Sequence, residues 1–203
     1  MPPRRVEKDA VFLNVPYDAQ FEKLYLAYIV GLTALGFVPR ATLGFPSDAT
    51  RISRIFKLIQ TCRFSVHDLS RVQLDTRRPP HAPRFNMPFE LGLAVAWAQL
   101  NPKKHTWIGC ERHPYRPLKS VSDLNGTDFH IHGGTIQGVM RELCNAFVRT
   151  TKRPSVPRMV KVYQQLRVTV PDLKREAGAR DLFQARVFDD LVVAAGALAE
   201  EYL

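Results

Sequence analysis

One stretch organises this chain: Arg84-Phe85-Asn86-Met87-Pro88-Phe89-Glu90-Leu91-Gly92-Leu93-Ala94. It predicts a helix that is apolar on nearly every side, which is typical of a buried helix. Asn86 suits the N-cap and Pro88 suits the first turn. From Asn86 to Pro102 the only charged residue is Glu90. That carboxylate is expected just inside the helix start, where the helix dipole favours its ionised form.

A carboxylate in such a helix is costly unless it is paired or has a function. A capping box would need its Glu three residues after the cap, where Phe89 stands. Two interpretations of Glu90 remain, a buried ion pair with a nearby arginine and a place in a functional site. We adopt the second as the working hypothesis.

Working outward, short apolar runs alternate with helical patterns. The predicted strands are 11–15, 37–42, 63–68, 105–110 and 129–131, and amphipathic helices lie between them and after the last. This alternation predicts an α/β fold, a doubly wound, mostly parallel five-stranded sheet in the order 2-1-3-4-5. Residues 70–83 have no periodicity and are expected to form a loop.

The composition is that of a globular protein, with 45% hydrophobic and 24% charged residues. The apolar run of the central helix is too short to span a bilayer, and no membrane partner is expected. No signal peptide is recognised. The three cysteines are odd in number and widely spaced, as is typical of reduced thiols in the cytosol, so a cytoplasmic location is expected.

The net charge of +10 favours anionic ligands or partners. Much of it lies beyond the alternating pattern, since residues 149–180 hold nine Lys and Arg against two Asp and Glu. We therefore predict an α/β domain over 1–149 and a basic helical extension over 150–203, with breaks near Pro171 and Gly178. The basic segment is either a solvated helical face or a surface that binds nucleic acid or a protein.

In an open parallel sheet, ligands bind outside the carboxyl ends of the strands at the point where the order reverses. Three segments are expected there, after the first strand, after the third strand and at the start of the central helix. They supply two carboxylates, two amides, a phenol and a hydroxyl: Asp68, Glu90, Asn14, Asn86, Tyr17 and Ser70. Glu90 has the ion-pair alternative given above, and each of the others has a structural alternative as well, as a strand-end or turn residue, a core aromatic ring or a helix cap.

Arg84 is expected either to meet a phosphate or to lie on an exposed face. Phe85 and Phe89 are each expected to stack on a base or to fill core, and core is the preferred interpretation for Phe89. There is no Gly-x-Gly-x-x-Gly after the first strand, no Walker lysine and no serine elbow. The carboxylates lack the neighbouring ligands of a metal site, so no metal is expected. A single carboxylate suits cleavage of an N-glycosidic bond, because it stabilises or attacks the cationic anomeric carbon.

Three segments together resemble a known superfamily: Val-Phe-Leu-Asn-Val-Pro (11–16), Cys-Arg-Phe-Ser-Val-His-Asp-Leu-Ser (62–70) and Asn-Met-Pro-Phe-Glu-Leu-Gly-Leu-Ala (86–94). The superfamily joins nucleoside 2-deoxyribosyltransferases with bacterial TIR-like domains, and the likeness covers residues 10–148. It implies a flavodoxin-like or TIR-like sheet, and it implies that Glu90 is the catalytic carboxylate. Met-Pro-Phe before Glu90 departs from the transferases, and the serine-rich run of eukaryotic TIR domains is absent, which leaves the substrate open.

The sequence and the resemblance together predict a nucleotide N-glycosidase, with NAD as substrate and no resident cofactor. The resemblance also implies self-association and a role in antiphage defence. Two other functions stay open, a non-catalytic nucleotide-sensing or nucleic-acid-linked binding module and a nucleoside deoxyribosyltransferase. A family member with a closed pocket and a role in assembly is a further alternative.

Overall fold

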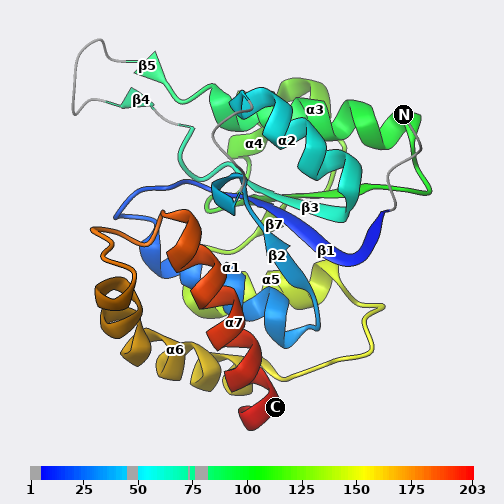
Figure 1. Cartoon of the computed structure of the whole chain (residues 1–203). Coiled ribbons are helices and arrows are strands. Elements are labelled where there is room, and N and C mark those ends of the chain that lie inside the picture. The colour runs from blue at the N-terminus through cyan, green and yellow to red at the C-terminus, as the bar shows by residue number, and fades with distance from the viewer. Residues whose placement is uncertain (1–5, 45–49, 73, 76–81) are drawn as a thin grey trace.

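The computed structural model describes residues 6–44, 50–72, 74–75 and 82–203. Its centre is a five-stranded sheet in the order β2-β1-β3-β6-β7, in which every strand pair is parallel (Figure 1). The strands are β1 (Glu7–Asn14), β2 (Val38–Arg40), β3 (Cys62–Asp68), β6 (Thr106–Glu111) and β7 (His130–Ile131). Counted along this sheet the order is 2-1-3-4-5, so the predicted fold class is confirmed.

Helices cover both faces of the sheet (Figure 1). One face carries α1 (Glu22–Ala34) and α5 (Ile136–Ala146), and the other carries α2 (Arg51–Thr61) and α3 (Asn86–Leu100), with the short α4 (Arg116–Ser120) on the same side. Strand β1 shows why both faces must be covered. Val11 and Leu13 pack into the core on the α1 side, whereas Ala10 and Phe12 pack with α2. A strand buried on both faces is apolar at successive positions, as this one is.

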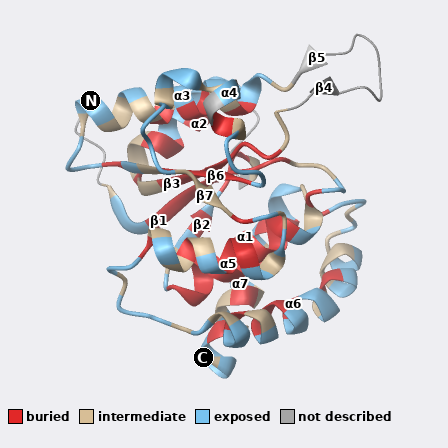
Figure 2. Cartoon of the chain, turned by 180° about the vertical axis from the view of Figure 1, so that it is seen from behind, coloured by how far each residue is buried: buried red, intermediate tan, exposed pale blue. Residues whose placement is uncertain are grey.

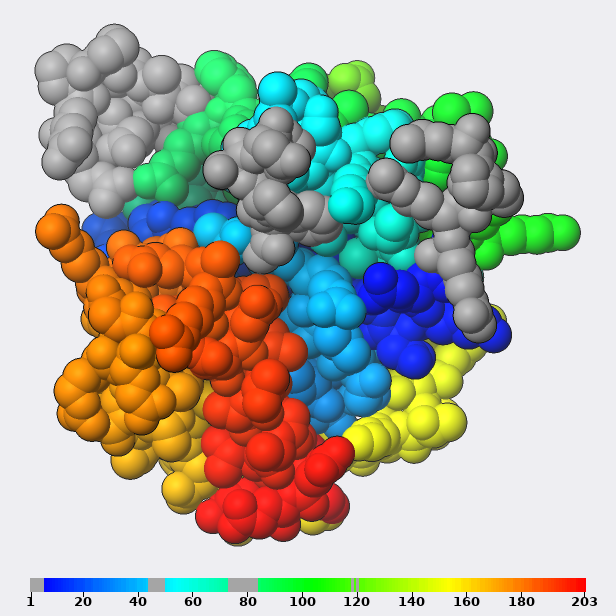
Figure 3. Space-filling view, in the orientation of Figure 1, coloured from blue at the N-terminus to red at the C-terminus, as the bar shows by residue number. Residues whose placement is uncertain are grey.

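The C-terminal extension consists of α6 (Val156–Glu176) and α7 (Ala185–Tyr202). Both helices pack against α1, and Figure 3 shows this orange and red segment covering one side of the molecule. Buried side chains such as Val162, Leu166 and Leu191 belong to the same hydrophobic cluster as α1 and β1. The extension therefore completes the core beneath the sheet.

The expected break at Pro171 is wrong, because α6 continues through it to Glu176. A proline inside a helix removes one backbone hydrogen bond. Burial of Met159, Val162, Tyr163, Leu166 and Val170 along one face holds this helix against the core on the N-terminal side of the proline. The second expected break is confirmed, since the helix ends before Gly178, whose φ is +61°.

The central helix α3 is not buried on every side as predicted. Only Met87, Glu90, Leu91 and Ala94 are buried, while Phe89 is 59% exposed. Figure 2 shows buried, intermediate and exposed residues side by side along α3. The prediction that Phe89 fills core is therefore wrong. The physical reason is that α3 lies in an outer layer, so only the face toward the sheet and α2 is covered.

Two further elements lie in the predicted 70–83 loop, which is not wholly irregular. Strands β4 (Leu74–Asp75) and β5 (Ala82–Pro83) pair antiparallel, and Arg77, Arg78, Pro79 and Pro80 lie outside the described residues. Short 3₁₀ turns form at Thr42–Gly44 and Ser122–Leu124. Within the described part of the chain, no helix combines the length and apolar character needed to cross a bilayer.

Candidate functional site

The buried carboxylate of Glu90 lies at the carboxyl edge of the sheet, near the ends of β1 and β3. The residue is only 2% exposed. Its Oε1 lies 3.5 Å from Nη2 of Arg51, whose side chain is 53% exposed. Its Oε2 is buried and has no hydrogen-bond partner among the described residues. The carboxylate is thus held by one long ion pair, and half of its hydrogen-bonding capacity is unused.

Burial raises the pKa of Glu90 above its ordinary value. The charge of Arg51 and the side-chain amide of Asn14 act in the opposite direction and favour the ionised form. No hydrogen bond of normal length satisfies Oε2, so neither partner fully offsets the cost of burying the charge. Carboxylates perturbed in this way concentrate at functional sites, although buried ion pairs also produce them.

A cleft of about 380 Å³ opens beside this carboxylate. It is lined by Val15, Pro16, Tyr17, Arg51, Arg84, Asn86 and Met87. Glu90 is not among the lining residues, whereas its partner Arg51 is. The volume is at the lower end of the range for small-molecule sites, roughly 300–1,000 Å³. The cleft accommodates a nucleoside-sized group with two guanidinium groups beside it.

A directional chain of hydrogen bonds orients Asn14 from behind. His105 Nδ1 lies 2.9 Å from the carbonyl oxygen of Cys62, which only accepts, so Nδ1 carries the proton. In neutral His105, Nε2 then accepts from Ser65 Oγ at 2.9 Å. Ser65 Oγ in turn accepts from Nε2 of His67 at 2.9 Å.

The remaining nitrogen of this second imidazole, His67 Nδ1, must therefore accept from Asn14 Nδ2 at 3.0 Å. This assignment leaves both imidazoles neutral, and it agrees with burial, which lowers the pKa of His67 to about 3. Asn14 is thereby held with its NH₂ group turned toward His67. Its second N–H is the group that can stabilise the Glu90 carboxylate.

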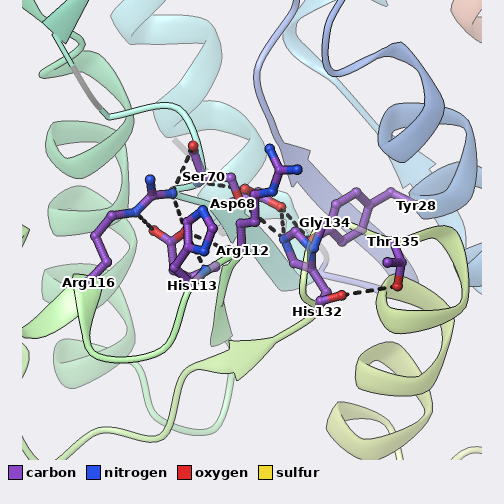
Figure 4. A network of polar contacts seen from close by, with 10 residues as sticks. Tyr28, Asp68, Ser70, Arg112, His113, Arg116, His132, Gly134 and Thr135 are labelled. Atoms are coloured by element: carbon purple, nitrogen blue, oxygen red, sulfur yellow. Dashed lines mark hydrogen bonds and ion pairs between the residues drawn. The ribbon is translucent and has the colours of Figure 1, made fainter.

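Asp68 and Ser70 lie in a separate, closed network (Figure 4). Asp68 is 0% exposed, and its Oδ2 accepts from Tyr28 at 2.7 Å and from His132 Nε2 at 2.9 Å. Its Oδ1 accepts from the backbone N–H of Ser70 at 2.8 Å. Both oxygens are occupied by protein groups, so the predicted role of Asp68 in binding substrate has no support from its geometry.

The same network contains Ser70, His132 and Asp68, the residue types of a hydrolytic triad, but not the geometry of one. A triad needs one imidazole nitrogen for the serine and the other for the aspartate. Here Ser70 Oγ and Asp68 Oδ2 both face Nε2 of His132, at 3.1 and 2.9 Å. Nδ1 accepts the backbone N–H of Gly134 at 3.0 Å. The arrangement ties β3 to the loop before α5 and does not activate a nucleophile.

Glu111 is a third buried acid at this edge, after Glu90 and Asp68, and sequence reasoning missed it. It is 0% exposed, pairs with Arg116 and accepts the backbone N–H groups of Arg112 and His113 (Figure 4). Arg116 also donates to the carbonyl oxygen of Ser70 at 2.8 Å. A carboxylate whose two oxygens are both occupied in this way is structural, and Glu90 differs from it because its Oε2 has no partner among the described residues.

The other predicted residues divide between the cleft and the surface. Tyr17 lines the cleft. Its ring packs against that of Phe183 in the C-terminal extension, with the ring centroids 5.8 Å apart, and burial raises the pKa of Tyr17 to about 12. Arg84 lines it too, and its Nη1 lies 2.8 Å from Asp18 Oδ2. Phe85 is 69% exposed and does not line the cleft.

Asn86 also lines the cleft, but its predicted role as the N-cap is wrong. The helix begins at Asn86 itself, Phe85 occupies the cap position, and no side chain caps the helix.

Arg51 is the cleft residue that sequence reasoning missed. It follows Thr50, which caps α2 by accepting the N–H of Ser53 at 3.3 Å, and nothing in the local pattern connects it to Glu90, 39 positions away.

Other chemistries find little support in the described part of the chain. Its three cysteines are unpaired, and burial raises the pKa of Cys62 to about 12, which keeps that thiol protonated. No group of three His, Cys, Asp or Glu side chains among the described residues is placed to hold a metal ion.

Comparison with known proteins adds no family: no family model matches the chain, and no curated protein matches it. The function is therefore inferred from the site itself.

Proposed function

We propose that this protein cleaves the N-glycosidic bond of a nucleotide, with NAD as substrate and Glu90 as the essential carboxylate. One observation carries the proposal: a carboxylate that is 2% exposed keeps one oxygen without a partner among the described residues, next to a nucleoside-sized cleft. A buried charge left unsatisfied is costly, and a function in the reaction explains why it is retained.

The chemistry needs only one ionised carboxylate. The bond between ribose C1′ and the nicotinamide nitrogen breaks, and both electrons go to the ring, which leaves as a neutral molecule. No acid is required for this leaving group. Glu90 stabilises the oxocarbenium charge that develops at C1′. Water then supplies a hydroxyl group to C1′ and releases its proton to solvent, so that hydrolysis is complete.

Arg51 has two roles in this proposal. In the free protein its guanidinium lies between the cleft and Glu90, joined to the carboxylate by a 3.5 Å contact. A guanidinium group can donate two parallel hydrogen bonds to phosphate oxygens, and such a pair is stronger than a single 3.5 Å contact with a carboxylate. When a nucleotide binds, Arg51 moves to its phosphate and uncovers Glu90. The presence of Arg84 in the same cleft favours a phosphorylated substrate over a free nucleoside.

The test is Glu90→Gln, incubated at high protein concentration with NAD and, separately, with deoxynucleosides. Products are separated by chromatography, and Glu201→Gln on the exposed end of α7 serves as the matched control. We expect nicotinamide release by the wild type and the control and none by Glu90→Gln. Equal turnover in all three proteins would remove Glu90 from the mechanism. Transfer of deoxyribose between bases would favour the deoxyribosyltransferase alternative.

A second function, a nucleotide sensor without turnover, is favoured by one observation. Glu90 does not line the cleft, whereas Arg51 and Arg84 do. A sensor would bind nucleotide through these guanidiniums and melt at a higher temperature with ligand present. It would release no nicotinamide, and Glu90→Gln would leave its affinity unchanged. A role in antiphage defence rests only on the resemblance, and it belongs to this proposal only if NAD is consumed.

A further inference from the structure

A second cleft lies at the same edge of the sheet, on the side of α1 and α5. Its volume is about 320 Å³. Residues from four separate segments line it, including Gln20, Lys23, Ser70, Arg71, Arg112 and Thr135. The lining mixes polar and apolar residues, and among them it carries three cationic side chains and no acid. No step proposed above uses this cleft.

Two of its cations are not neutralised. Neither Lys23 nor the guanidinium of Arg112 forms an ion pair with any residue in the described ranges, and both residues are exposed. Gly134, whose φ is +70°, leaves the space that the side chain of Arg112 occupies. A Cβ atom at Gly134 would lie 2.3 Å from Nε of Arg112. Because glycine stands there, the guanidinium lies directly against the backbone, a placement that a larger residue would prevent.

The two clefts are joined through one carboxylate oxygen. Asp18 Oδ2 accepts from Nε of Arg71 at 3.3 Å and from Nη1 of Arg84 at 2.8 Å. Arg71 lines the second cleft and Arg84 lines the first. The two guanidiniums therefore lie side by side on the boundary between the clefts.

We propose that the second cleft is a phosphate-binding subsite, which holds the phosphorylated end of the same substrate whose ribose reaches Glu90. Arg84 and Arg71 lead the phosphates from the first cleft into the second, where Lys23 and Arg112 bind their oxygens. Arginine and lysine are the side chains that recognise phosphate, and the polar groups between them suit sugar hydroxyls. The identity of the substrate rests on the proposed N-glycosidase function, while the phosphate preference rests on the cations of this cleft alone.

The subsite is tested by the binding of ADP-ribose to the full chain, measured by titration calorimetry at low and high salt. ADP-ribose carries the phosphates but no leaving group. The double variant Lys23→Gln/Arg112→Gln is compared with Lys161→Gln/Arg167→Gln, which makes the same charge change on the exposed face of α6. We expect the first variant to bind about tenfold more weakly, because it loses two charge-assisted contacts, and the second to bind like the wild type.

Three results would overturn the subsite: no binding of ADP-ribose by the wild type, equal binding by the cleft variant, or an equal loss in the α6 control. Nicotinamide release is measured on the same proteins and separates this inference from the proposed function. Salt-sensitive binding that depends on Lys23 and Arg112, with no nicotinamide release, supports the subsite and refutes the glycosidase. Release of nicotinamide with the same KM for NAD in both double variants supports the glycosidase and refutes the subsite.

Discussion

Replacing Glu90 by glutamine should stabilise this protein while it abolishes activity. The carboxyl group is buried, and one of its oxygens, Oε2, has no hydrogen-bond partner among the described residues. Glutamine keeps the shape of the side chain and removes the charge. The opposite result is expected at Glu111, where the carboxylate is saturated by Arg116 and by two backbone N–H groups. The two buried glutamates therefore form a matched pair.

The magnitudes follow from these contacts. Leaving a buried polar group unsatisfied costs about 1–3 kcal/mol, part of which Glu90→Gln removes. The loss of the 3.5 Å contact with Arg51 offsets little, because Arg51 is 53% exposed and such pairs contribute about 0–1 kcal/mol. We expect a gain of about 1 kcal/mol at pH 7, or about 2–4 °C in Tm for a chain of this size. Glu111→Gln should cost about 3–5 kcal/mol, as breaking a buried ion pair does.

The assay is urea unfolding of both variants and the wild type at several pH values. Burial raises the pKa of folded Glu90 above that of the unfolded chain. The carboxyl group therefore opposes folding most strongly above that raised pKa, and the penalty declines as the pH falls from the raised pKa to the ordinary pKa of the unfolded chain. The advantage of Glu90→Gln should be largest at neutral pH, should shrink below the raised pKa, and should vanish once the pH lies below the ordinary pKa. If Glu90→Gln is as destabilising as Glu111→Gln, Glu90 is a structural ion pair and the catalytic reasoning fails.

Four further outcomes are expected. Arg51→Gln should move the acid limb of the proposed NAD turnover to higher pH in a kcat/KM profile, since Arg51 lowers the pKa of the Glu90 carboxyl group. The pKa of His67 is about 3 in the folded protein, below its value in the unfolded chain, so the wild type should lose about 1.4 kcal/mol of unfolding free energy per pH unit as the pH falls from 6.5 toward 3. Urea unfolding of His67→Leu should lack that contribution. Gly134→Ala should cost about 1–3 kcal/mol and weaken ADP-ribose binding in calorimetry, since it strains the backbone and displaces Arg112. Truncation after Thr150 should unfold or aggregate the chain, seen by circular dichroism and sedimentation, because it removes α6 and α7 from the shared core.

Local patterns were sufficient to predict the sheet. Strand β1 is apolar at successive positions, which is typical of a strand covered on both faces, and strands alternating with helices favour a parallel arrangement. The order 2-1-3-4-5 was then the order expected of a five-stranded doubly wound sheet, and the structure confirms it. The same reasoning failed for α3, because composition alone does not distinguish a helix buried all round from one that leaves Phe89 exposed in an outer layer.

For the candidate site, the sequence by itself determined which acid deserved attention. Glu90 is the only charged residue in a long apolar stretch, and this is visible without coordinates. Its partners were decided by tertiary structure, since Arg51 is 39 positions away and the ring nitrogens of His67 acquire their roles only through Ser65 and Asn14. The same holds for Asp68, which looked like a ligand-binding acid. Hydrogen bonds act over about 3 Å between segments that only folding brings together, so their donors and acceptors cannot be paired from the order of residues along the chain.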